Sequence, residues 1–146
     1  MRPFLAVVVA LVVALVAAPL AARADPAPEA TYDFTVKPVA PLKAGAKGQL
    51  VIAITPKAGV PGNPHVSEQA PLQAKLASSA GLRLAKEQLG RADAKATQTH
   101  GTELTVAFDA VAAGKQQITG KMDFFVCTDK WCLRQERDVT AAVDVK

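Results

Sequence analysis

The two cysteines of this 146-residue chain lie near its C-terminal end, in the run FFVCTDKWCL at positions 124–133. The same run holds the single tryptophan, Trp131. Alternating apolar residues lead into the run from Ile118 and out of it toward Val145, and alternation with a period of two indicates half-buried β-strands. We therefore expect one cysteine at each end of a short turn between two strands.

Cys127 and Cys132 enclose four residues, 128–131. If the flanking strands pair as a hairpin with that loop, the two thiols lie directly opposite each other, at a Cα separation that a disulfide accepts. Closing so short a loop stabilises the fold by roughly 2 kcal/mol on the chain-entropy estimate, less than a bridge between distant strands. The pair therefore leaves room for a redox role beside a structural one.

The first 24 residues have the pattern of a secretory signal peptide. Arg2 precedes an apolar stretch from Phe4 to Leu20, and Ala22-Arg23-Ala24 places small residues where a signal peptidase cleaves. The apolar stretch is only marginally long enough to span a bilayer of roughly 30 Å, which favours cleavage over a retained anchor. We expect an exported protein, periplasmic or secreted, without membrane attachment after cleavage. In such an oxidising compartment, two cysteines are expected to form a disulfide.

Cleavage removes Arg2 and Arg23 but no acidic residue, so the formal net charge falls from +4 to +2. The remaining Lys and Arg residues are interspersed with Asp and Glu, whereas nucleic-acid binding calls for basic residues gathered on one face. No nucleic-acid partner is expected. The mature length suits one domain, residues 32–146, after a flexible Pro- and Ala-rich leader at residues 25–31.

Short alternating segments separated by proline and glycine run through the mature chain. The segment Leu72–Leu76 fits either a short helix or a strand, and the neighbouring strands favour a strand. Residues 86–101 have no clean period and are expected to form a long loop, with at most a helical turn. Strands are expected at residues 32–36, 49–55, 72–76, 82–84, 102–109, 118–126 and 139–145.

This pattern predicts an all-β protein, with about seven or eight short strands and no persuasive long helix. The expected architecture is an antiparallel β-sandwich of immunoglobulin-like type. The Cys-Trp-Cys spacing of a true immunoglobulin domain is absent from the sequence.

The run Phe125–Leu133, with alternating strands on both sides, resembles the N-terminal periplasmic domain of the thiol:disulfide interchange protein DsbD. The similarity extends over about Tyr32 to Val145, and its specific part is the cysteine hairpin. In that family an immunoglobulin-like domain passes electrons from a membrane partner to periplasmic disulfide-handling proteins. The resemblance implies that Cys132 forms the mixed disulfide with a partner and that Cys127 resolves it.

The chain differs from the family pattern at three points. Leu133-Arg134-Gln135 stand where the family commonly has prolines, and residues 86–101 contain no aromatic residue to cap the cysteine pair. No membrane domain or thioredoxin-like domain follows before Lys146. Redox activity is therefore expected to need a separate partner, either a thioredoxin-like protein or a membrane electron donor.

Two interpretations of the cysteine pair remain open. It is either the exchange site of a thiol–disulfide oxidoreductase component or a structural bridge that only fixes the hairpin of a non-enzymatic, protein-binding domain. Phe125, Lys130 and Trp131 are the candidates for partner contact, because aromatic residues are enriched at interfaces and Lys130 lies inside the loop.

Other chemistry has little support in the sequence. His65 and His100 lack the compact spacing of a structural zinc site and are expected in surface or loop positions, so no metal ion is expected. Ser67, Ser78 and Ser79 lie in no Gly-x-Ser-x-Gly motif, which argues against a serine hydrolase. Neither glycine-rich loop has a phosphate-binding pattern, and no cofactor is expected.

Overall fold

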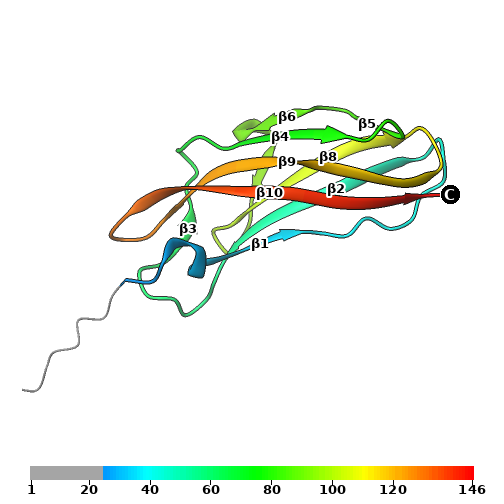
Figure 1. The fold of residues 1–146 in the computed structure, drawn as a ribbon. Helices are drawn as coiled ribbons and strands as arrows, with labels where there is room; N and C mark the ends of the chain where they lie inside the picture. The colour runs from blue at the N-terminus through cyan, green and yellow to red at the C-terminus, as the bar shows by residue number, and fades with distance from the viewer. Residues whose placement is uncertain (1–24) are drawn as a thin grey trace, which may run out of the picture.

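The computed structural model describes residues 25–146, in which two antiparallel β-sheets pack face to face (Figure 1). Helical structure in this part of the chain is limited to two 3₁₀ turns, η1 (Pro28–Ala30) and η2 (Arg91–Asp93). None of the described residues belongs to a helix long and apolar enough to cross a membrane. The predicted signal peptide, residues 1–24, lies outside the described residues.

The first sheet has the strand order β1-β2-β8-β5, and β7 also pairs with β8. The second sheet has the order β10-β9-β4-β6, and β3 also pairs with β9. The strands of the first sheet are β1 (Tyr32–Val36), β2 (Lys47–Pro56), β5 (Leu82–Leu84), β7 (Ala94–Ala96) and β8 (Thr102–Ala110). Those of the second are β3 (His65–Val66), β4 (Gln73–Ser78), β6 (Gln88–Gly90), β9 (Gly114–Cys127) and β10 (Cys132–Val145).

This strand order is that of an immunoglobulin-like sandwich. One sheet of such a domain contains strands A, B, E and D, and the other contains C, F and G. Here β1, β2 and β8 correspond to A, B and E, with β5 and β7 in the place of D, while β4, β9 and β10 correspond to C, F and G. The predicted immunoglobulin-like antiparallel β-sandwich is therefore confirmed.

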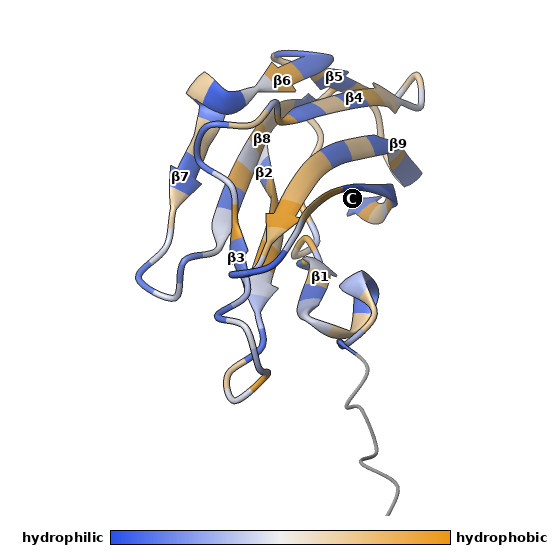
Figure 2. Ribbon diagram, turned by 90° about the vertical axis from the view of Figure 1, so that its left-hand side faces the viewer, coloured by the Kyte–Doolittle hydropathy of each residue, from blue (hydrophilic) through white to orange (hydrophobic). Residues whose placement is uncertain are grey.

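The alternation in the sequence becomes the two faces of each strand. In β9, Met122, Phe124 and Val126 are fully buried between the sheets, while Lys121 on the opposite face is exposed. Figure 2 shows the same alternation of hydrophilic and hydrophobic residues along β4 and β9. Because apolar area removed from water is stabilising by about 25 cal/mol per Å², these inward faces hold the two sheets together.

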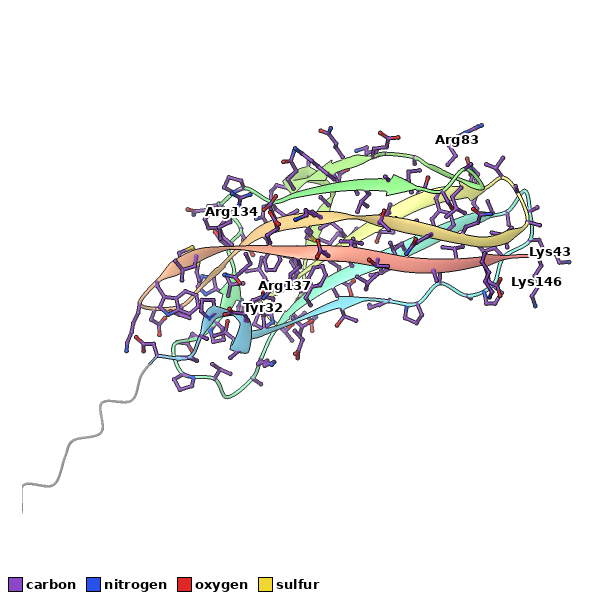
Figure 3. All side chains as sticks on the ribbon, in the orientation of Figure 1. Tyr32, Lys43, Arg83, Arg134, Arg137 and Lys146 are labelled. Carbon is purple, nitrogen blue, oxygen red and sulfur yellow. A yellow bond between two sulfur atoms is a disulfide. The ribbon has the colours of Figure 1, made fainter. Side chains whose placement is uncertain are left out.

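An aromatic cluster joins the first sheet to the second. The rings of Tyr32 and Phe124 meet edge to face at 5.3 Å between centroids, and Phe34 stacks on Phe124 at 6.1 Å. Tyr32 Oη donates a hydrogen bond to Gln135 Oε1 at 3.1 Å, and the Arg137 guanidinium lies 5.3 Å from the centre of the Tyr32 ring (Figure 3). Burial raises the pKa of Tyr32, and the positive charge of Arg137 opposes that rise. The cluster therefore fixes the cysteine-bearing half of β10 to the body of the sandwich.

The segment around residues 72–76 is a strand, β4, in agreement with the favoured prediction. Its Ala74 and Leu76 are buried, whereas Gln73 and Lys75 are exposed, which is the period of a strand. In the predicted leader, residues 28–30 form η1 and Thr31 is fully buried.

The prediction of a long loop at residues 86–101 was wrong for its two short strands, whereas the helical turn allowed within it is present. This segment contains β6, η2 and β7. Each of the two strands is three residues long and lies at a sheet margin, where Leu89 is the only buried side chain of β6. Residues 88–90 and 94–96 lack the two large apolar residues, two positions apart, that indicate a strand at 82–84, which is why the sequence predicts a loop here.

Gly120 allows β4 and β9 to pair closely. It lies opposite Leu76, and a Cβ atom at this position would overlap the carbonyl oxygen of Lys75 and lie 2.9 Å from the Leu76 Cα. Both neighbours belong to the backbone of β4, so neither can turn away as a flexible side chain would. The centre of the second sheet therefore requires glycine at position 120.

Replacing Gly120 by alanine is expected to lower the free energy of unfolding by about 1–3 kcal/mol, as overpacking of a core does. The matched control is Gly90→Ala on β6 of the same sheet, where the nearest atom to an added Cβ is the Leu72 carbonyl oxygen at 3.7 Å, an ordinary contact. Urea unfolding of both variants measures the difference. Equal stability of the two variants would contradict the close approach of β4 to β9.

Candidate functional site

The structure contains a disulfide between Cys127, the last residue of β9, and Cys132, the first residue of β10. The two residues are opposite each other in the ladder, with their Cα atoms 3.9 Å apart. Thr128 N donates a hydrogen bond to Trp131 O at 2.7 Å. Hydrogen-bonded and non-hydrogen-bonded pairs alternate along an antiparallel ladder, so the next pair, Cys127 and Cys132, is non-hydrogen-bonded. Such pairs bring opposite side chains closest, which is why a bridge forms here.

The Thr128 side chain closes the turn between the cysteines. Its Oγ1 accepts hydrogen bonds from Lys130 N at 3.2 Å and from Trp131 N at 3.3 Å. Threonine hydroxyls commonly stabilise turns by bonding to backbone groups a few residues on. The turn is therefore held by its own polar groups as well as by the disulfide.

The disulfide lies on the outer face of the second sheet. Side chains alternate along a strand, so Cys127 and Phe125 point away from the core that Phe124 and Val126 fill. Cys132 and Arg134 share this outer face on β10, and Arg134 Nη2 forms an ion pair of 2.6 Å with Asp123 on β9. The bridge is thus outside the hydrophobic core.

The two cysteines differ in exposure. Cys127 is 7% exposed, and β9 pairs with β10 on one side of it and with β3 on the other. Cys132 is exposed, since β10 is the edge strand of the sheet. Thiol–disulfide exchange depends on which sulfur an incoming thiolate reaches. Of the two cysteines, Cys132 is therefore the more accessible to another molecule.

The loop at residues 56–64 holds the tip of the hairpin. Asp129 N donates a hydrogen bond to Gly62 O at 2.9 Å, and Asn63 Nδ2 donates to Asp129 Oδ2 at 3.0 Å. Gly62 has a φ of 93°, and a Cβ there would lie 3.2 Å from the Thr128 Cβ. At the other side of the tip, Lys130 Nζ lies 2.7 Å from Asp25 Oδ1. The sequence marks this loop only as turn-rich and carries no signal that it meets the hairpin.

The three residues named as contact candidates lie in different surroundings. Trp131 is half-buried and packs against the hydrophobic core, while Phe125 is half-buried on the outer face beside Cys127. Lys130 is exposed and ion-paired. The sequence reasoning missed Leu133, which is 45% exposed next to Cys132. Leu133 lies opposite the buried Val126, so the alternation along β10 predicts an inward, buried side chain. In the folded structure this side chain is nevertheless exposed.

A hollow of about 880 Å³ is lined by residues 56–60 and 63–69 and by the turn at residues 99–100. Both histidines line it: His65 on β3, opposite Cys127, and His100 in the turn. His65 is half-buried with its Nδ1 3.0 Å from Asn63 O, and His100 is exposed. Among residues 25–146, no group of three or more His, Cys, Asp or Glu side chains is placed to hold a metal ion.

Arg91 holds the segment that follows β3. Its Nη2 donates hydrogen bonds to Ser67 O at 2.6 Å and to Ala70 O at 2.8 Å. Partial burial lowers the pKa of Arg91, and the negative charge of Glu68 counteracts this. The side of the hollow next to β3 is therefore fixed to η2.

No protein-family model matches the chain, and no curated protein matches it. Solved structures that are similar in outline include the following two. AggA, the major subunit of aggregative adherence fimbriae type I from Escherichia coli, is 6% identical over 79% of this chain and 95% of that chain, with a TM-score of 0.35. PapD-like domain 7 of human CEP192 is 9% identical over 99% of this chain and 98% of that chain, with a TM-score of 0.34. At these TM-scores neither similarity carries an argument about function.

The unequal exposure of the cysteines predicts unequal reactivity after reduction. Single-thiol variants, Cys132→Ser and Cys127→Ser, isolate each sulfur, and iodoacetamide is applied at about pH 10, above the ordinary thiol pKa of about 8.5. The Cys132 thiol is expected to react faster than the Cys127 thiol in the folded protein. In urea-unfolded protein the two rates should converge, and equal rates in the folded state would contradict the assigned roles.

Proposed function

We propose that this chain is an exported thiol–disulfide exchange domain, similar in role to the N-terminal domain of DsbD. It passes reducing equivalents through Cys127 and Cys132 to or from another extracytoplasmic thiol–disulfide protein. The observation that carries the proposal is the disulfide at the tip of an edge hairpin, which joins one exposed cysteine to one buried cysteine on an outer face. Export is proposed from the pattern of residues 1–24.

The exchange proceeds in two balanced steps. A thiolate of the reducing partner attacks the Cys132 sulfur, the S–S bond breaks, and its electron pair leaves on the Cys127 sulfur. A second thiolate of the partner then attacks the partner's own sulfur in the mixed disulfide and releases Cys132 as a thiolate. The chain gains two electrons and the partner becomes a disulfide; the same steps in reverse transfer the electrons onward.

The surrounding structure supports a bridge that opens without unfolding the domain. The ladder of β9 and β10 pairs every residue from Gly114 to Cys127, and Thr128, Asp129 and Lys130 hold the tip independently of the sulfurs. The bridge itself closes a short loop, which contributes only about 2 kcal/mol. Reduction therefore costs a small part of the stability of a typical domain, which is about 5–15 kcal/mol.

The surface around Cys132 supports contact with a protein partner. Phe125 is half-buried on the same outer face as the disulfide, while Leu133, exposed directly after the exchanging cysteine, follows the opposite face of β10. Lys130 and Arg134 are each paired with a carboxylate, so the charges flanking the site are largely balanced. A hairpin tip with exposed apolar side chains and balanced charge suits a protein with an exposed dithiol, such as a thioredoxin-like protein or the extracytoplasmic part of a membrane electron donor.

The alternative is a non-enzymatic sandwich in which the bridge is purely structural. The hydrogen bonds from the hairpin tip to Gly62 and Asn63 favour it, because they make the tip part of a fixed surface that the bridge completes. On this alternative neither cysteine forms a mixed disulfide with another protein.

Trapping separates the two functions. A Cys127→Ser variant exported to a bacterial periplasm keeps Cys132 free and cannot resolve a mixed disulfide. It is expected to form covalent complexes with thioredoxin-fold proteins, which appear on non-reducing gels, dissolve in dithiothreitol and link through Cys132 by mass spectrometry. The matched control, Cys132→Ser, keeps the buried thiol and should form few or none. No complexes with Cys127→Ser, or equal amounts with both variants, would overturn the proposal.

A further inference from the structure

The register of β3 assigns a role to His65. We propose that its imidazole gives a proton to the Cys127 sulfur when the disulfide opens and takes that proton back when the disulfide closes. This inference rests on the proposed exchange and names the residue that handles the proton of the leaving sulfur.

Three residues form a row across three neighbouring strands. Cys132 on β10 lies opposite Cys127 on β9, and Cys127 lies opposite His65 on β3. Directly opposite residues of antiparallel strands project to the same face, with Cβ atoms about 4.5–5.5 Å apart. His65 therefore flanks Cys127 on the side away from Cys132, on the outer face that carries the disulfide.

Backbone hydrogen bonds fix this register although β3 has only two residues. Ser67 N donates to Phe125 O at 3.0 Å, two positions along the same ladder. Val66 N donates to His100 O at 2.9 Å, which ties the other side of β3 to the neighbouring turn. A slip by one residue would move Val66, now 3% exposed, out of the core.

The hydrogen bond of the imidazole determines which ring nitrogen is free. Nδ1 of His65 lies 3.0 Å from Asn63 O. A carbonyl oxygen only accepts hydrogen bonds, so Nδ1 carries the hydrogen, and in the neutral ring Nε2 has the free lone pair. Nε2 is thus the nitrogen that exchanges a proton with a neighbouring thiol.

The leaving sulfur needs such a group because Cys127 is 7% exposed. Burial disfavours a thiolate, and a neighbouring imidazolium favours it. The nearest cations of the hairpin, Lys130 and Arg134, are ion-paired with Asp25 and Asp123. On the other side of β3, Lys57, Glu68 and His100 line the same hollow as His65.

The proton and electrons balance in both directions. When a thiolate attacks Cys132, the electron pair of the S–S bond goes to the Cys127 sulfur, and the imidazolium of His65 transfers its Nε2 proton there. When the bridge re-forms, neutral Nε2 takes the S–H proton, and the Cys127 thiolate displaces the partner's thiolate from Cys132. The partner dithiol or disulfide supplies or receives the two electrons, and no other reactant is needed.

The test uses the exported chain with Cys132→Ser, which leaves Cys127 as the only thiol. His65→Asn in this background keeps an amide donor near the position of Nδ1 and removes Nε2. The ionisation of the thiol is followed by its absorbance at 240 nm from pH 4 to pH 10. The expected result is a higher titration midpoint, with the thiolate fraction at pH 7 reduced about tenfold, the size expected for loss of one neighbouring charge.

His100→Asn is the matched control. His100 also lines the hollow but is not paired with any residue of β9. Its backbone φ of 58° is one that asparagine adopts readily, so the substitution is tolerated. This variant is expected to titrate like the background protein. A His65→Gln variant, a second neutral replacement, should repeat the His65→Asn result. Identical titrations of the His65 and His100 variants would overturn the inference.

A second readout tests the inference during exchange. With both cysteines present, reduction by glutathione at pH 7 is expected to be slower in His65→Asn than in His100→Asn, and its pH profile should differ. If Cys132 forms mixed disulfides but the titration midpoint of the Cys127 thiol is the same with and without His65, the role of His65 fails and the proposed function stands. If replacing His65 shifts the titration midpoint of the Cys127 thiol but no mixed disulfide forms, the proposed function fails and the influence of His65 on Cys127 stands.

Discussion

The backbone ladder between β9 and β10 determines where the sulfur chemistry lies. It pairs Gly114 with Val145 at one end and Cys127 with Cys132 at the other. A slip of one residue would turn every side chain to the opposite face, and the buried Met122 and Phe124 oppose it. The ladder therefore places the two sulfurs opposite each other, on the outer face and at the tip of the sheet. In Figure 1 the hairpin turn and the C-terminus lie at opposite ends of the sandwich.

Stability and chemistry are carried by different groups. The inward faces of both sheets and the cluster of Tyr32, Phe34 and Phe124 hold the sandwich together. The hairpin tip is held by hydrogen bonds to Gly62 and Asn63. None of these contacts involves the sulfur of Cys127 or Cys132, so they do not depend on the bridge.

Much of the fold could be predicted from the sequence because long strands repeat a local pattern. Residues 102–109 and 118–126 alternate over several periods, and β8 and β9 contain them. The same alternation, together with the four-residue loop at residues 128–131, predicts that Cys127 and Cys132 lie opposite each other in the hairpin. Strands β3, β6 and β7 were not predicted, since none of them repeats a large apolar residue two positions apart, as Leu82 and Leu84 of β5 do, and their pairing depends on distant chain segments.

Of the candidate site, only the Cys127–Cys132 disulfide could be predicted from the sequence. The sequence places Cys127 and Cys132 together, but the contact of Asp129 with Gly62 and the position of His65 opposite Cys127 join segments far apart in the chain. The exposure of Leu133 depends on which neighbours the fold supplies, since its alternation alone points inward. Such features are set by tertiary packing and leave no local signal in the sequence.

The reduction potential of the Cys127–Cys132 pair separates an exchange site from a structural bridge. The mature chain is equilibrated with dithiothreitol and glutathione buffers of known potential, and the reduced fraction is counted by thiol labelling. An exchange site predicts a value in the range of known exchange proteins, between about −120 and about −270 mV. A value well below about −300 mV, typical of inert structural bridges, would contradict the account.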